Sequence, residues 1–155
     1  MFQINNLFNN KNIQCVSQMG QFFVCEHQKD LSVSPYNAET AYFSSEMNVK
    51  RRQVLVQLNN TGCFIQAGAM QWMLGNVNMK TNVTAGNFLG KAASAMVTKE
   101  TIAKPEYTGQ GYLMLEPTYK HIILIDVSKW GQIVLDDGLF LACDNTLQYK
   151  TVSRK

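Results

Sequence analysis

The sequence has few charged residues, few prolines and no apolar run long enough to cross a membrane. Charged residues make up 16% of the 155 residues, and there are three prolines. The longest uninterrupted apolar run is far shorter than the roughly 20 residues that a membrane-spanning helix needs. The first residues show neither the basic segment nor the apolar segment of a signal peptide. We therefore expect no transmembrane segment and a cytoplasmic location.

The charge balance gives little support to a nucleic-acid partner. The net charge is only +3, and the one basic run is the three residues 50–52. Nucleic-acid-binding domains usually carry a broader basic stripe. Nucleic acid is therefore an unfavoured partner, kept below as an alternative. The low charge content also leaves fewer residues to cover a monomer's surface, so we expect a partner chain to cover some of the apolar surface.

The cysteines lack the spacing of a metal site or a redox motif. There are four, far apart and with no Cys-x-x-Cys pair: Cys15, Cys25, Cys63 and Cys143. Three of them lie within apolar runs, where free thiols act as small buried hydrophobic groups. Such usage is typical of a reducing compartment.

No other group of residues predicts catalysis. The two histidines, His27 and His121, lie in different regions, and neither has a metal ligand at a suitable spacing. The sequence contains no Gly-x-Ser-x-Gly motif. The adjacent Asp136 and Asp137 are better explained as a hairpin turn than as an acid–base pair. We therefore expect no catalytic residue, no cofactor and no bound metal, and hence a protein that is not an enzyme.

Short apolar runs closed by turn residues are the main pattern that is present. They predict strands at 21–26, 31–34, 41–44, 54–58, 77–83, 112–116, 121–127, 132–135, 139–143 and 147–152. Residues 59–62 predict a tight turn, residues 117–120 would join one hairpin, and residues 136–138 would join another. The glycines at 109 and 111 predict a bulge or a close backbone approach rather than a phosphate loop.

These strands predict an all-β fold, an antiparallel β-sandwich or β-clip with at most one short helix near 86–97. We expect a single domain over residues 1–155. It could consist of two repeated β units, about 1–85 and 100–155, because Thr61-Gly62 and Thr108-Gly109 each precede a strand.

One apolar run is a candidate interaction surface. It combines soft, adaptable methionine with tryptophan, residues that binding surfaces favour. Its members are Met70, Trp72, Met73, Gly75 and Asn76. Burial in the protein's own core is the alternative interpretation.

Several motifs together resemble the altered inheritance of mitochondria protein twenty-four family. They lie at residues 68–77, 107–111, 115–117, 121–126 and 136–142. The resemblance covers roughly residues 50–152 and implies a fold like that of the tryptophan RNA-binding attenuation protein, built from repeated β units that assemble into oligomers. Mitochondrial members are associated with organelle biogenesis, and the resemblance implies no catalytic residue or cofactor. Because it also implies a further β unit after Val152, we expect the sequence to be a short form or a piece of a longer chain.

The leading hypothesis is thus a non-enzymatic, self-associating β scaffold or interaction protein. One alternative is binding of single-stranded RNA, which would use aromatic residues beside lysines. Another is binding of a small apolar ligand or a membrane surface through the run from Met70 to Met73.

Overall fold

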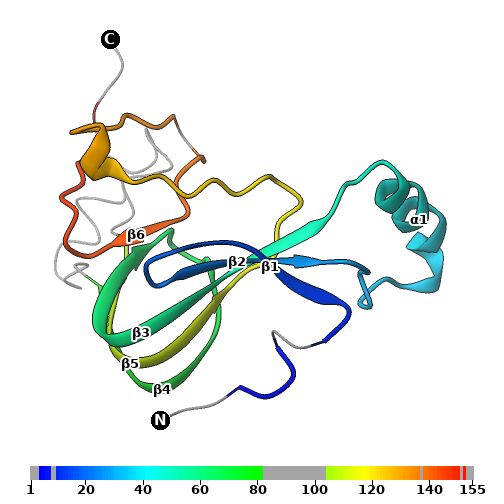
Figure 1. Cartoon of the computed structure of the whole chain (residues 1–155), viewed down its shortest axis with the longest axis horizontal. Coiled ribbons are helices and arrows are strands. Elements are labelled where there is room, and N and C mark those ends of the chain that lie inside the picture. Colours follow the sequence, from blue (N-terminus) through cyan, green and yellow to red (C-terminus); the bar gives the residue numbers. More distant parts are fainter. Residues whose placement is uncertain (1–3, 8–9, 82–103, 137, 151, 153–155) are drawn as a thin grey trace, which may run out of the picture.

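The computed structural model describes residues 4–7, 10–81, 104–136, 138–150 and 152, and six strands in it form one antiparallel sheet (Figure 1). The strands are β1 (Ile13–Met19), β2 (Phe22–His27), β3 (Arg51–Ile65), β4 (Met70–Lys80), β5 (Glu106–Leu115) and β6 (Ala142–Asp144). Their order is β1-β2-β3-β5-β4, and β6 pairs with β3. The antiparallel, mostly β prediction is confirmed, whereas the sandwich or clip stays a prediction.

The long strand β3 organises the sheet. Its first half pairs with β2, its second half pairs with β5, and its last residues pair with β6. The predicted strand at 54–58 lies within β3, and residues 52–56 and Leu58 are buried while Gln57 is exposed. Two apolar clusters lie on opposite sides of the sheet. One contains Val54, Val56, Leu113 and Leu115, and the other contains Leu55 and Met114.

The predicted turn at residues 59–62 is wrong, because β3 continues through it. The register against β5 shifts between Asn59 and Thr61, and Asn60 takes a positive φ of 55°. Asparagine tolerates this conformation better than most residues. The extra residue therefore forms a bulge, which bends a strand instead of ending it. Figure 1 shows β3, β5 and β4 as strongly curved neighbours.

The predicted hairpin between residues 112–116 and 121–127 is also wrong. After β5, Thr118 continues along β3 and exchanges two backbone hydrogen bonds with Arg52, of 2.7 and 2.8 Å. Pro117 has no N–H and interrupts the ladder there. Residues 121–126 form no strand, and a short 3-10 turn, η3 (Val127–Lys129), follows them.

The second predicted hairpin fails as well, since β6 pairs with β3 and residues 132–135 are not a strand. The expected strands at 31–34 and 147–152 do not form in the part of the chain that the structure describes. The expected helix near 86–97 lies outside the described residues.

The one α-helix in the described ranges is α1 (Ala38–Glu46), where a strand is predicted at 41–44. A 3-10 turn, η1 (Pro35–Asn37), leads into it, and Glu39 lies in its first turn. Proline at a helix start and an acidic residue in the first turn both favour a helix. Figure 1 shows α1 away from the sheet, on the connection between β2 and β3.

Candidate functional site

The predicted interaction run forms most of β4, the last strand in the sheet order. Met70 and Trp72 are half-buried, and they contact different sides of the sheet. Met70 packs against the cluster of Val56 and Leu115, whereas Trp72 packs against the cluster of Leu55 and Met114. These two residues therefore serve mainly as core.

The rest of the run is exposed. Met73, Gly75 and Asn76 all face solvent, and Met73 is 48% accessible. The neighbouring Leu74 and Met79 are also exposed, at 41% and 53%. The run is thus divided between a buried start and an exposed apolar middle.

The glycines of β5 allow β4 to approach closely. A Cβ atom on Gly109 would lie 2.2 Å from the carbonyl oxygen of Asn76, and one on Gly111 would lie 2.0 Å from that of Leu74. Both glycines have positive φ. The predicted close backbone approach at this Gly-x-Gly is confirmed, while the bulge nearest to it lies on β3.

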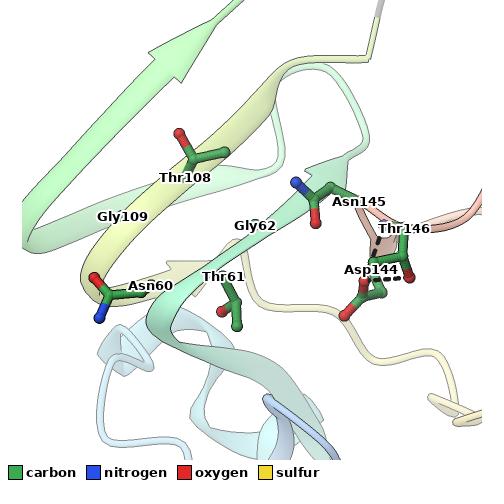
Figure 2. A pocket seen from close by; sticks show the side chains of 8 residues that line it. All are labelled: Asn60, Thr61, Gly62, Thr108, Gly109, Asp144, Asn145 and Thr146. Atoms are coloured by element: carbon green, nitrogen blue, oxygen red, sulfur yellow. Dashed lines mark hydrogen bonds between the residues drawn. The ribbon is translucent and has the colours of Figure 1, made fainter.

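An open cavity of about 570 Å³ lies where β3, β5 and β6 meet (Figure 2). Its lining is small and polar: Asn60, Thr61, Gly62, Thr108, Gly109, Asp144, Asn145 and Thr146. The two Thr-Gly pairs that could mark repeated units are here neighbours, because Thr61 lies opposite Gly109 and Gly62 opposite Thr108. The sequence did not predict this cavity, since its residues come from three distant segments.

Several polar groups of the cavity already have hydrogen-bond partners. Asp144 accepts hydrogen bonds of 2.9 and 2.7 Å from the backbone and hydroxyl of Thr146, and one of 3.1 Å from Gln21. Asn145 donates to Glu106 over 3.0 Å. Groups already paired in this way have little capacity left for a ligand. The cavity is therefore best explained as the place where three strands meet and are held together by hydrogen bonds.

The residues considered for chemistry are dispersed. His27 lies 2.8 Å from the side-chain oxygen of Gln53, whose amide nitrogen donates to Gln71 and to the carbonyl of Leu115. His121 and Asp136 lie in irregular segments, and Asp137 lies outside the described residues. Within those residues no three His, Cys, Asp or Glu side chains are grouped as metal ligands.

The four cysteines are free, and burial suppresses the reactivity of three of them. Cys25 and Cys63 are fully buried, and burial raises the pKa of the Cys25 thiol to about 11 and that of Cys63 to about 12. Burial also raises the pKa of Cys143 to about 11. A nucleophilic cysteine needs a lowered pKa, so none of these three has the environment of one.

An acidic residue ties down the base of the connection that carries α1. The carboxylate of Asp30 accepts from the hydroxyl of Ser32 at 2.6 Å, from Tyr119 at 2.8 Å and from Arg51 at 3.0 Å. The hydrogen bond from Ser32, followed by those from Tyr119 and Arg51, holds the pKa of Asp30 well below its usual range. Beside it, Arg52 pairs with Glu26 at 2.8 Å.

Beyond this base, α1 is almost uncovered. None of its residues is buried, and its main contact with another element is with η1. We call residues 31–49 the arm. Several large hydrophobic side chains of the arm face solvent. They are Leu31, Tyr36, Tyr42, Phe43, Met47 and Val49. The sequence pattern did not predict this surface, because residues 41–44 read as a strand, although Pro35 was a usable signal for a helix start.

No described helix is long and apolar enough to span a bilayer. The comparisons with curated proteins and with solved structures found no match. The family model described as mitochondrial biogenesis AIM24 matches residues 43–155, well over half of the chain and including β3 to β6. This is the family that the sequence motifs resemble. The chain therefore belongs to the mitochondrial biogenesis AIM24 family.

Proposed function

We propose that this chain is a non-enzymatic, oligomeric β scaffold that acts by binding other chains. The observation that carries the proposal is the exposed apolar surface on the arm and on β4. Tyr36 is 97% exposed and Met47 is 78% exposed, although both are large side chains. Exposed apolar patches of this kind commonly mark interaction surfaces.

The stability of α1 supports the same proposal. A helix of nine residues is too short to be stable in water by itself, since isolated helices below about 12–15 residues are marginal. Most helices gain stability from packing an apolar face, and α1 has little packing in the monomer. A partner chain against Tyr42 and Phe43 would supply it.

The charge on the arm favours a protein partner over a membrane. Residues 31–49 carry Glu39 and Glu46 and no lysine or arginine. Anionic lipid surfaces attract basic segments and repel acidic ones. We therefore place the arm against another protein chain.

Sedimentation velocity of the purified chain tests the oligomeric part of the proposal. We expect species larger than the 17.5 kDa monomer at micromolar concentration. A single monomeric species up to about 100 μM, with no cross-linked product, would refute self-association. A general hydrolase screen with turnover that depends on a specific residue would refute the non-enzymatic part.

Single-stranded RNA binding is supported less well. Trp130 is exposed, but its neighbour Lys129 pairs with Asp126 at 3.5 Å, and the hydroxyl of Tyr119 donates to Asp30. Titration with mixed RNA oligomers tests this alternative. A shift that weakens steeply with salt would support it, because phosphate contacts release counterions.

Binding of an apolar ligand or a membrane through Met70 to Met73 is weakened by the packing of Trp72 against the core. Trp72→Ser separates the two roles. If Trp72 is mainly a core residue, as we expect, the variant should lose much of its stability. Reduced liposome binding at unchanged stability would instead favour a membrane-binding role.

The location that we propose is a reducing compartment such as the cytoplasm. The support is four free cysteines, two of them buried in the core. Fractionation of cells that express a tagged full-length protein tests it.

A further inference from the structure

In the part of the chain that the structure describes, the outer edge of β4 has no strand partner. Among the described residues β4 pairs with β5 alone, with one register shift near its start, between Met70 and Trp72, and a continuous ladder from Trp72 to Lys80. Natural edge strands are commonly short, interrupted by bulges, or protected by proline and charge. The eleven residues of β4 contain no proline and a single charged residue, Lys80, at the very end. The opposite edge, β1, is shorter and has a bulge in its middle between Cys15 and Ser17.

The backbone groups that face outward from β4 can be identified. The carbonyl groups of Leu74 and Asn76 lie against Gly111 and Gly109, so they face β5. In an antiparallel strand, alternate residues direct their N–H and C=O groups to opposite sides. Met73, Gly75 and Val77 therefore present theirs at the open edge.

This outward set is complementary to itself. Gly75 is the central residue of β4, midway between Met70 and Lys80. An antiparallel pair of β4 strands centred on Gly75 would place Met73 opposite Val77 of the second copy. Every residue that faces outward would then meet another that does. The two-fold axis of such a pair gives a closed dimer, in which both copies use the same surface.

Charges at the ends of β4 favour the same arrangement. Lys80 ends the strand, and Glu116, whose N–H donates to the carbonyl of Ala69 over 2.7 Å, lies beside its start. Both are exposed, and neither forms an ion pair within the described residues. Antiparallel pairing would bring Lys80 of each copy toward Glu116 of the other, and parallel pairing would not.

We propose that two copies of this chain associate through β4, as antiparallel strands with Gly75 at the centre and Lys80 near Glu116 of the second copy. This inference rests on the proposed function and names its partner and its contact. The exposed side chains of Met73 and Leu74 become covered in the pair. The six-stranded sheet of each copy becomes half of a continuous sheet.

Charge reversal at the strand ends provides the sharpest test. Sedimentation equilibrium would compare the wild type with Lys80→Glu, Glu116→Lys and the double variant. Each single variant turns two attractive pairs into two repulsive pairs, so we expect a dimer Kd about tenfold weaker. The double variant should return to within about threefold of the wild type. A double variant no tighter than the singles would overturn the proposed pairing.

Met73→Lys tests the middle of the edge without altering the core. A lysine there places a charge opposite Val77 of the second copy, on both sides of the axis, and should weaken the dimer about tenfold or more. Val16→Lys, at an exposed position on β1, is the matched control and should leave Kd unchanged. Circular dichroism and the unfolding midpoint of each variant verify that it is folded.

The same measurements separate this inference from the proposed function. The β4 variants, Met73→Lys and the charge reversals, could form the same oligomer as the wild type while the double variant Tyr42→Ser and Phe43→Ser is monomeric. In that case self-association stands and the β4 pairing is wrong. If the wild type is a monomer, both fail.

The register can be measured directly. A spin label at Asn78→Cys, in a Cys15→Ser background, reports the separation of the two labelled positions. The centred register places residue 78 opposite Trp72 of the second copy. The two labelled backbones then lie about 20 Å apart along the strands, at roughly 3.4 Å per residue. A register shifted by two residues would lengthen or shorten this separation by about 7 Å, and such a distance would reject the centred register.

Discussion

Single residues set the curvature of the sheet and the spacing of its strands. Asn60 absorbs the extra residue of the β3 bulge at positive φ, and Gly109 leaves room for the carbonyl of Asn76. Both effects depend on a backbone that a larger or β-branched residue would resist. The sheet is therefore sensitive at positions that contribute no apolar contact.

Gly109→Ala should destabilise the protein by about 2–4 kcal/mol, since the new Cβ meets a backbone oxygen that cannot move alone. Gly20→Ala is the matched control, because Gly20 also has a positive φ but nothing lies within 4 Å of an added Cβ. It should cost only about 1 kcal/mol. Urea unfolding of the two variants measures the difference, and equal losses would show that no clash exists at Gly109.

Asp30 makes the base of the arm sensitive to acid. Its pKa is lowered in the folded chain, first by the hydroxyl of Ser32 and then by Tyr119 and Arg51. A lowered folded pKa gives stability that is present above the unfolded value of about 3.9 and is lost as pH falls through the folded value.

Asp30→Asn should therefore lower the unfolding free energy by roughly 1–2 kcal/mol at pH 7. The difference from the wild type should shrink steadily from about pH 5 to pH 2. Urea unfolding across this range measures it. A difference that does not change with pH would mean that the ionised carboxylate makes no contribution.

At the scale of elements, α1 and the sheet are nearly independent. The helix packs mainly on η1, while both apolar clusters are built from the strands and the segments that pack on them. Energetic coupling between elements requires shared contacts. The arm should therefore be removable without loss of the fold.

Replacing residues 33–48 with a short Gly-Ser linker should shift Tm by no more than about 3 °C, because little buried apolar area is lost. Calorimetry of the shortened and full-length chains measures this shift at a concentration where both are monomeric. Leu55→Asn is a useful contrast, since Leu55 is fully buried between β2 and β5 and the substitution should unfold much of the chain. A large Tm loss on arm removal would reveal packing that the monomer does not show.

At the scale of the whole molecule, the buried thiols report global unfolding. Cys15 is exposed, whereas Cys25 and Cys63 lie in the two apolar clusters and have raised pKa values. With a thiol reagent at pH 8 we expect Cys15 to react within minutes. The two buried thiols should react only as the sheet opens.

Mass spectrometry of labelled peptides over a urea series measures the order of reaction. Cys25 and Cys63 should become labelled together at the midpoint of unfolding, as a single cooperative sheet requires. Early labelling of Cys63 alone would instead show that the end of β3, where β6 pairs, opens first.

The sequence by itself determined the β-rich character and the strand at 54–58, because short apolar runs and turn residues are local signals. Its motifs also indicated the family. The sequence also predicted the close approach at Gly109 and Gly111, and a strand at 77–83 that overlaps only the end of β4. Local signals could not decide which strands pair. Residues 59–62 have turn chemistry, yet they form a bulge because β5 and β6 pair with β3 on either side of the bend.

Only the tertiary structure decided the remaining features. It paired Thr118 with Arg52 in place of a hairpin, left the arm outside the core, and placed β4 last in the order of the described strands. Each depends on contacts between segments far apart in the chain, and loop closure and burial set those contacts. A low charge content and few prolines are visible in the sequence, but which strand comes last among the described strands is a property of the fold.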